Sequence, residues 1–332
     1  EIDRMIGTIK NAWAVPVEER VSYIRRYVVR EIFDSGRLHA LAENCRRASR
    51  LLANNDIAFI FTDGLQNRTI NTTMEIAKSS DIATGVSWHG PYIQDYKLDI
   101  LGCDPRYGRI VDYCLTWGDV HEDWLRSIGS GAETIRIGNL ILSGQAPSEM
   151  AAERKTQNAL ILQYAAPHAD IFWPQAGQYG FFVAAARAYR DAGFQNIRLK
   201  LHPGPSKIEY YERIAALFDI ECEIVIEGPF MKHVEWADSV TGPVHSGAML
   251  EVMRAGKPYL PALYGPHGIN RSYLDEEILI EDDDALRQAI ARNARPDAGP
   301  TLERFASARS IPDPAATAWA VFEKVAGQPG HA

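Results

Sequence analysis

The spacing of apolar and polar positions divides the chain into a helical start and two α/β blocks. In residues 1–55, apolar side chains recur about every 3.6 positions with arginines between them, which predicts helices. From residue 57 to residue 139, short apolar runs alternate with helical spacing, and the same alternation returns between residues 158 and 263. Strands that alternate with helices in this way indicate βαβ units and parallel sheets.

Turns rich in glycine, proline and aspartate separate the elements that this pattern predicts. Strands are expected at residues 57–62, 82–88, 112–118, 133–139, 158–165, 197–203, 221–228, 237–242 and 257–263. Helices are expected at residues 72–79, 121–129, 181–193, 207–218, 247–255 and 312–327, the last with an apolar face at Ala320, Val321 and Val325. This face would allow the last helix to pack back across the junction between the two blocks.

A polar segment separates the two blocks. Residues 141–156 are polar and begin without periodicity, which places a domain junction there. The predicted domains are residues 1–150 and residues 151–332, each with a Rossmann-like sheet, and the two domains face a cleft. The predicted fold class is therefore α/β, with a helical N-terminal segment.

Composition and charge narrow the class of protein. Of the 332 residues, 46% are apolar and 23% are charged, as in an ordinary globular protein. The formal net charge of -8 argues against a general nucleic-acid binder, which needs a basic surface. No run of 18 apolar residues occurs and no signal peptide opens the chain, so we expect a cytoplasmic protein. The missing initiator methionine leaves open that the chain is one domain of a longer protein.

The cysteines and the N-terminal arginines carry weaker signals. The cysteines are far apart and form no CxxC pair, and no DxD-type metal signal stands out, so we expect free thiols and no bound metal. The arginines of residues 1–55 either form a solvated helix face or contact anionic lipid at the inner membrane.

Candidate ligand contacts follow the strands of the second block, because ligands of open parallel sheets bind beyond the carboxyl ends of the strands. Ser246-Gly247-Ala248 opens a predicted helix, whose free N–H groups and dipole favour a phosphate. A simple N-cap is the alternative role for Ser246. Glu251 is near enough to the helix start to reach a ribose diol, or else it is an exposed helix residue.

The pair His202-Pro203 ends another apolar strand of the second block. His202 can donate a hydrogen bond to a phosphate or a base, while Pro203 fixes the direction of the chain. Lys200 and Lys207 flank the pair and supply positive potential. The alternative for His202 is a loop residue without a ligand contact.

The first block offers Asp63 and His89, each directly after a predicted strand. A carboxyl group at a strand end can accept a proton from an attacking hydroxyl, and histidine is suited to proton transfer. Asp63-Gly64 is equally an ordinary turn signal, and His89 is equally a hydrogen-bonded loop residue. Both residues are therefore candidates for acid–base catalysis.

Residues 237–263 resemble the donor-binding segment of GT-B glycosyltransferases. They comprise a strand, a turn with Ser246 and Gly247, a helix with Glu251 early in it, then Gly256-Lys257-Pro258 and a strand. The first block is similar to capsule-type transferases, with a His-Gly pair after a strand and later Trp-Gly and Gly-Asn pairs. These resemblances imply the GT-B fold and a nucleotide-sugar donor bound by the second domain.

His202-Pro203 is similar to a pair found in bacterial sialyltransferases and Kdo transferases. That resemblance implies that His202 and Ser246 contact the CMP part of the donor. Asp63 would correspond to a catalytic carboxylate of the sialyltransferases, with Thr62 in place of their preceding acid. The implied function is transfer of Kdo from CMP-Kdo to a lipopolysaccharide or capsule acceptor, without a metal cofactor.

Three other functions stay open at this point. The first is a CDP-glycerol or CDP-ribitol phosphotransferase. The second is a sugar-nucleotide 2-epimerase, which shares the two-domain fold and similar Ser-Gly and His-Pro turns. A non-catalytic binding domain within a larger assembly protein is the third, and it predicts ligand binding without turnover.

Overall fold

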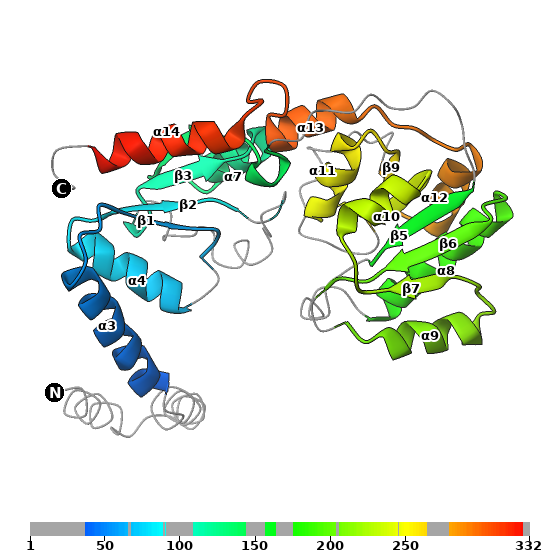
Figure 1. Ribbon diagram of the computed structural model, residues 1–332, viewed down its shortest axis with the longest axis horizontal. Coiled ribbons are helices and arrows are strands. Elements are labelled where there is room, and N and C mark those ends of the chain that lie inside the picture. The colour runs from blue at the N-terminus through cyan, green and yellow to red at the C-terminus, as the bar shows by residue number, and fades with distance from the viewer. Residues whose placement is uncertain are drawn as a thin grey trace, which may run out of the picture.

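The computed structural model describes residues 37–65, 68–88, 90, 109–143, 157–163, 175–203, 206–244, 246–263 and 279–327. Two parallel sheets lie side by side, each with helices against it (Figure 1). The helices predicted before residue 37 and the catalytic candidate His89 lie outside the described residues. The α/β class with two Rossmann-like sheets is confirmed.

The four strands of the first sheet follow one another in chain order, all parallel. They are β1 (Phe59–Thr62), β2 (Ala83–Val86), β3 (Tyr113–Thr116) and β4 (Glu133–Arg136). Helix α4 (Arg68–Ser79) follows β1, and α7 (Asp119–Ser127) follows β3. Right-handed crossovers place both helices on one face, where Met74, Cys114 and Trp124 share a buried cluster. Helix α3 (Arg37–Ala53) packs beside α4.

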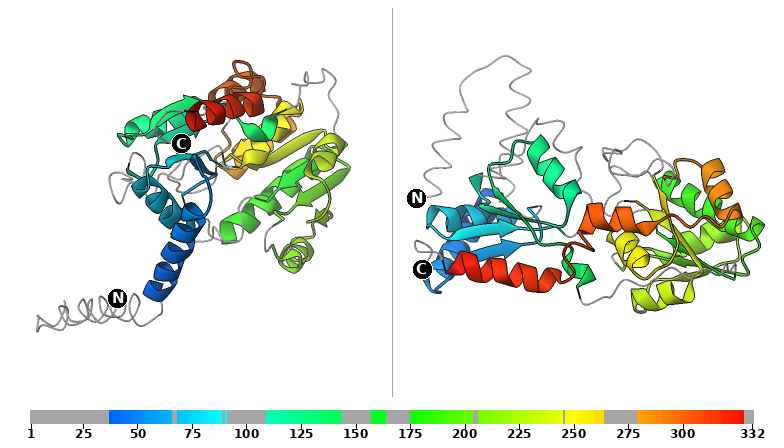
Figure 2. Two further views of the ribbon diagram at one scale, coloured as in Figure 1. Left: turned by 60° about the vertical axis from the view of Figure 1, so that its left-hand side comes forward. Right: turned by 90° about the horizontal axis from the view of Figure 1, so that it is seen from above.

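Helix α14 (Pro314–Ala326) covers the other face of this first sheet (Figure 2). Its Ala318, Val321 and Val325 are buried against β2 and β3, and Phe322 lies with its ring centroid 5.2 Å from that of Phe61. The expectation that Ala320 belongs to the apolar face was wrong, because Ala320 is exposed. One residue is about 100° of helix rotation, so the stripe through Ala318 and Val321 turns Ala320 away from the sheet.

The second sheet has the strand order β7-β6-β5-β8-β9, again all parallel. Its strands are β5 (Asn158–Leu162), β6 (Asn196–Lys200), β7 (Glu223–Val225), β8 (Ser239–Pro243) and β9 (Tyr259–Ala262). Its helices are α8 (Gln175–Asp191), α9 (Ile208–Leu217), α10 (Phe230–Trp236), α11 (Gly247–Arg254) and α12 (Asp283–Ala291). The largest core lies here, with Leu160, Phe181 and Tyr189 fully buried.

Helix α13 (Ala298–Ala306) connects the two halves of the molecule. It packs against α11 of the second half and α7 of the first. The backbone N–H of Asn139, in the first half, donates to the carbonyl of Ala306 at 3.3 Å. The short helix η2 (Leu140–Leu142) also contacts both α11 and α14. The junction between the halves is therefore packed on the side where α13 and α14 run.

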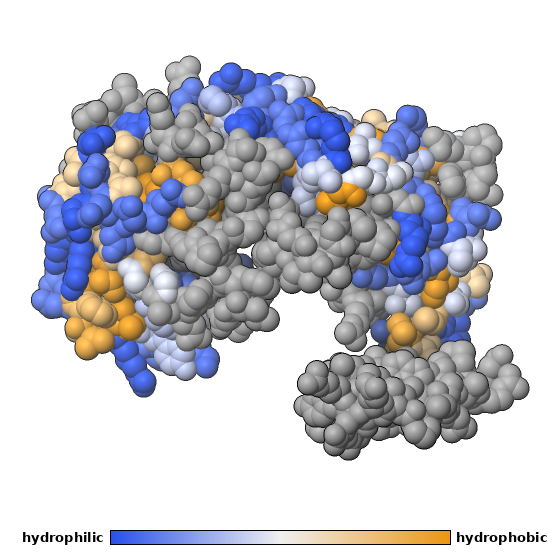
Figure 3. Space-filling view, turned by 180° about the vertical axis from the view of Figure 1, so that it is seen from behind, coloured by the Kyte–Doolittle hydropathy of each residue, from blue (hydrophilic) through white to orange (hydrophobic). Residues whose placement is uncertain are grey.

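The surface of the described residues is mainly polar, with apolar side chains in separate areas (Figure 3). The large apolar side chains that are exposed there are spread over α3, η2, the α9 region and α14, and they are Leu41, Leu51, Ile141, Tyr210, Leu217, Phe218 and Trp319. Within the described residues, no helix has the length and hydrophobicity needed to cross a bilayer.

Candidate functional site

Strand order defines the position of the candidate site. From β5 the chain moves outward to β6 and β7, and then returns to add β8 on the opposite side of β5. Such a reversal opens a crevice beyond the carboxyl ends of the two strands, and ligands of open α/β sheets bind there. The strands described in the first sheet run in chain order and show no reversal among themselves. The strongest topological site is therefore between β5 and β8.

Gln163 lies directly after β5, on one side of this crevice. Its side-chain Oε1 accepts the backbone N–H of His202 at 2.7 Å and the hydroxyl of Ser206 at 2.9 Å. The side chains of His202 and Pro203 are exposed beyond the end of β6. Sequence reasoning missed Gln163, although a polar residue that ends a buried apolar strand is a detectable signal.

Lys200 is more deeply placed than the sequence suggested. It is only 7% exposed, and its Nζ donates to the carbonyl oxygens of Leu201 at 3.0 Å and Ile226 at 2.5 Å. Burial lowers the pKa of this ammonium group, because the charged form loses water. An ammonium has three donors, and two of them bind backbone here. Lys200 thus joins the end of β6 to the end of β7.

Ser246 begins α11 on the other side of the crevice. Its hydroxyl oxygen accepts the N–H of Ala248 at 3.3 Å, which is the geometry of an N-cap. The first N–H groups of a helix have no intrahelical acceptor, so the amide of Gly247 is suited to an anion at this position. The N-cap and the anion site are therefore compatible roles for this turn.

Gly242, near the end of β8, is closely packed against its neighbours. A Cβ at Gly242 would lie 2.7 Å from the Cβ of Leu162 and 2.8 Å from the hydroxyl of Tyr259. That hydroxyl donates to the carbonyl of Pro243 at 2.9 Å. The last residues of β5 and β8 are thereby packed together, and the side chain of Tyr259, the first residue of β9, reaches the end of β8.

Glu251 is the acidic residue nearest to this helix start on α11. It is partly buried, and desolvation raises the pKa of its carboxyl group. A carboxyl group that loses water without a compensating partner costs stability, unless a ligand supplies hydroxyl donors. The contact of Glu251 with a ribose diol stays a prediction.

We expect Glu251→Gln to stabilise the free protein at neutral pH. Because the folded pKa lies above the unfolded one, the wild type loses stability as pH rises from about 4 through the folded pKa. The glutamine variant lacks this loss, so its melting midpoint should exceed that of the wild type at pH 7 and match it near pH 4. Thermal melts at both pH values test this, and equal midpoints at pH 7 would contradict it.

In the first domain, Asp63 follows β1 and is exposed in a turn where the Thr62 hydroxyl donates to the Gly64 carbonyl at 3.2 Å. Trp88 follows β2, and its ring lies 4.5 Å from that of buried His121. Thr62 and Val86 are register partners, so the residues after β1 and β2 lie at the same edge of the sheet. Asp63 is thus at a carboxyl edge, as predicted.

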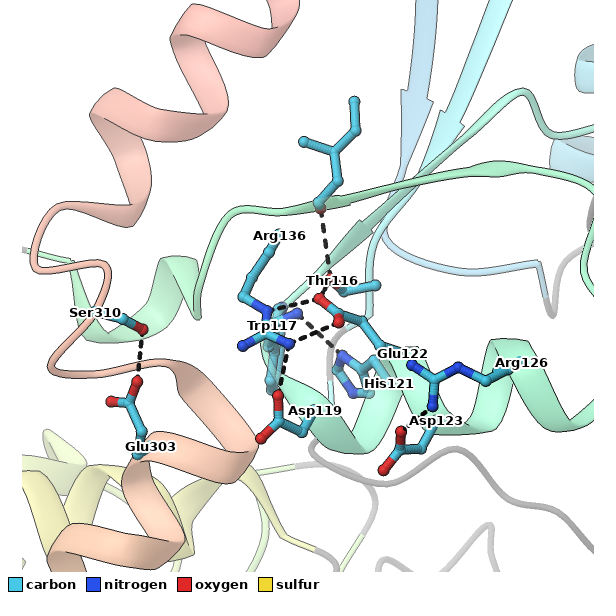
Figure 4. Close-up of polar contacts among 11 residues, drawn as sticks. Thr116, Trp117, Asp119, His121, Glu122, Asp123, Arg126, Arg136, Glu303 and Ser310 are labelled. Atoms are coloured by element: carbon cyan, nitrogen blue, oxygen red, sulfur yellow. Dashed lines mark hydrogen bonds and ion pairs between the residues drawn. The ribbon is translucent and has the colours of Figure 1, made fainter.

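An ion-pair network lies at the neighbouring carboxyl ends of β3 and β4, and the sequence did not point to it (Figure 4). Arg136 binds Asp119 at 2.5 Å and Glu122 at 2.6 Å, and Thr116 donates to Glu122 at 3.2 Å. Hydrogen bonding to Arg136 lowers the pKa of Glu122. Both carboxylates are in the first turn of α7, where the helix dipole also favours them. The network fastens α7 to the sheet.

The described residues contain no group of three or more histidine, cysteine, aspartate and glutamate side chains placed to hold a metal ion. The described cysteines are free, and burial raises the pKa of Cys114 to about 12 and that of Cys222 to about 11. Such thiols are poor nucleophiles. Cys114 and Cys222 are therefore no candidates for nucleophilic catalysis.

Comparison with solved structures identifies the fold. No protein-family model matches the chain, and no curated protein matches its sequence. The pneumococcal O-GlcNAc transferase GtfA, solved with UDP and GlcNAc, aligns over 86% of this chain and 60% of its own length, with a TM-score of 0.56 and 13% identity. A glycosyltransferase from Rickettsia africae aligns over 88% and 83%, with a TM-score of 0.55 and 9% identity.

A third structure, TarM, aligns over 87% of this chain and 58% of its own length, with a TM-score of 0.50 and 11% identity. The chain thus spans about three-fifths of the length of GtfA and TarM. At these identities the likeness concerns the fold alone. The chain has the GT-B fold of glycosyltransferases, with two Rossmann-like domains.

Proposed function

We propose that this chain is a glycosyltransferase that binds an activated sugar beyond the carboxyl ends of β5 and β8. The reversal of strand order at β5 carries the proposal. It places the His202 loop and the Ser246 helix start at one edge of the sheet, on either side of Gln163. The likeness in fold to glycosyltransferases supports the same class of function.

For the donor we propose a CMP-activated ulosonic acid, most specifically CMP-Kdo. The ground for this choice is the resemblance of His202-Pro203 and Ser246 to the CMP-binding residues of Kdo and sialic acid transferases. His202 and the N–H groups at the start of α11 bind the phosphate, and Glu251 accepts from the ribose hydroxyls. The two sides of the crevice then enclose a single phosphate.

The acceptor is a hydroxyl of an oligosaccharide or glycolipid, bound by the first domain. Asp63 removes its proton, with His89 as a second candidate for proton transfer. The acceptor oxygen forms a bond to the anomeric carbon, the bond from that carbon to the phosphate oxygen breaks, and CMP leaves with the electron pair. Positioning of the two substrates and stabilisation of the charge in the transition state supply the remainder of the rate enhancement.

A thermal-shift panel of CMP, CDP, UDP and GDP tests the donor site. A ligand that binds only the folded state raises the free energy of unfolding by about 2.7 kcal/mol at a concentration 100 times its Kd. We expect CMP to raise the melting midpoint most. A preference for UDP or GDP would contradict the CMP donor, and no response to any of the four would contradict the nucleotide site.

His202→Ala is the variant that goes with this panel. Its side chain is exposed, so the melting midpoint of the free protein should stay near that of the wild type while the shift caused by CMP decreases. A variant with an undiminished CMP shift would remove His202 from the site. Product analysis without an acceptor separates a transferase from an epimerase, since only the epimerase would change the sugar nucleotide.

A further inference from the structure

Gln163 has the central position of the switch point. It follows β5, which has β6 on one side and β8 on the other, and the residue is only 9% exposed. A buried carboxamide has an oxygen that accepts and a nitrogen that donates, and both normally find partners. The way these two atoms are used therefore indicates what the residue does.

The oxygen of this carboxamide forms hydrogen bonds with the loop after β6. Oε1 accepts the backbone N–H of His202 and the hydroxyl of Ser206, at 2.7 Å and 2.9 Å. The peptide N–H can only donate, so the oxygen rather than the nitrogen must face this loop. The orientation of the carboxamide is thereby determined, and the His202 loop is held against the end of β5.

The nitrogen is used differently. Within the part of the chain that the structure describes, Nε2 of Gln163 makes no hydrogen bond. Some side-chain atoms of the described residues are both fully buried and without a hydrogen-bond partner, and Nε2 of Gln163 is not among them. Because Nε2 has no partner, it must be accessible to solvent. The amide nitrogen is a solvent-accessible donor, and the hydrogen bonds of Oε1 fix its position at the carboxyl edge of the sheet. A donor fixed in this way is preorganised for an anionic ligand such as a phosphate.

We propose that Gln163 has two roles in the nucleotide site. Through Oε1 it is a positioning residue that fixes the loop carrying His202, and through Nε2 it donates a hydrogen bond to a phosphate oxygen of the nucleotide. The second role rests on the proposed function, because it names the nucleotide phosphate as the acceptor. The first role concerns the loop alone.

Two substitutions separate these roles. Gln163→Glu keeps an oxygen that accepts from His202 and Ser206, but it replaces the donor with a second carboxylate oxygen. Gln163→Leu removes both atoms. We expect Gln163→Glu to retain slow hydrogen exchange at the His202 amide while CMP affinity falls by about tenfold or more, as for the loss of a hydrogen bond to a charged group. Gln163→Leu should lose both the slow exchange and the affinity.

Gln195→Glu is the matched control, since it makes the same amide-to-carboxylate change at an exposed residue directly before β6, at the opposite edge of the sheet. It should leave CMP affinity within about twofold of the wild type, because at this distance solvent and salt screen the added charge. Wild-type affinity in Gln163→Glu would overturn the donor role, and unchanged His202 exchange in Gln163→Leu would overturn the positioning role. A wild type that binds no nucleotide instead contradicts the proposed function, while the exchange measurement still tests the loop.

Discussion

Asp63→Ala is expected to lower sugar transfer by about 10²–10⁴-fold, the usual contribution of a general base. The carboxyl group is exposed at the carboxyl edge of the first sheet, in the turn after β1. The substitution removes a proton acceptor from the reaction but no contact with the proposed nucleotide site, which is in the second domain. Affinity for CMP should therefore stay unchanged while the rate of transfer falls. Steady-state kinetics with the donor that the nucleotide panel selects, together with CMP titration, measure both quantities.

Asp56→Ala is the matched control for this prediction. Asp56 is also exposed, but it precedes β1 and so lies toward the opposite edge of the sheet. Removing its carboxyl group makes the same change in net charge without approaching the proposed site. We expect its rate to match that of the wild type. Retained transfer in Asp63→Ala would exclude Asp63 from the mechanism, and equal losses in both variants would point to a general charge effect.

The strands were predictable from sequence because most of them are short apolar runs between turns. The predicted strands were too long, since residues 221–228 contain only the three-residue strand β7. Apolar side chains continue past the hydrogen-bonded ladder into the loops that cover the core, as Ile226 does. Hydrophobicity therefore indicates which residues are buried, whereas the length of a strand depends on how many of its residues pair with the neighbouring strand.

Helices α10, α12 and α13 were missed for a different reason. Each is short, with seven to nine residues, so the apolar period repeats too few times to indicate a helix without a second signal. The equally short α7 and α11 had such a signal, in Gly129 at the end of one and the Ser246-Gly247 turn at the start of the other. Capping was the usable signal for two of the missed helices. Asp282 accepts the N–H of Ala285 at the start of α12, and Asp297 accepts that of Gly299 at the start of α13.

The candidate site shows where sequence reasoning ends. His202 and Ser246 were recognisable because each follows a strand and stands in a distinctive turn. Gln163 was not, because its importance comes from the central place of β5 between β6 and β8. Strand order results from packing among segments far apart in the chain, and no local pattern contains it. The Arg136 network depends on the β3–β4 pairing in the same way.

Gly118→Ala is expected to destabilise the protein by about 1–3 kcal/mol, the usual cost of overpacking. A Cβ at Gly118 would lie 2.4 Å from the carbonyl oxygen of Arg304 and 3.2 Å from the backbone nitrogen of Ala306. These are backbone atoms of α13 and its end, so no side-chain rotation relieves the clash. The φ of Gly118 is -175°, an extended value that alanine also adopts, so the cost is steric rather than conformational.

Gly180→Ala provides a control of opposite sign for this prediction. It lies in α8, where no atom comes within 4 Å of the added Cβ, and alanine favours the helix by about 0.8–1 kcal/mol. Thermal melts should therefore place Gly118→Ala several degrees below the wild type and Gly180→Ala slightly above it. Because Gly118 is where α13 meets the start of α7, the loss would locate part of the stability of the whole chain at the junction of its halves. An unchanged midpoint in Gly118→Ala would mean that α13 moves aside freely, and the contact of η2 with α11 would then be the more important one between the two halves.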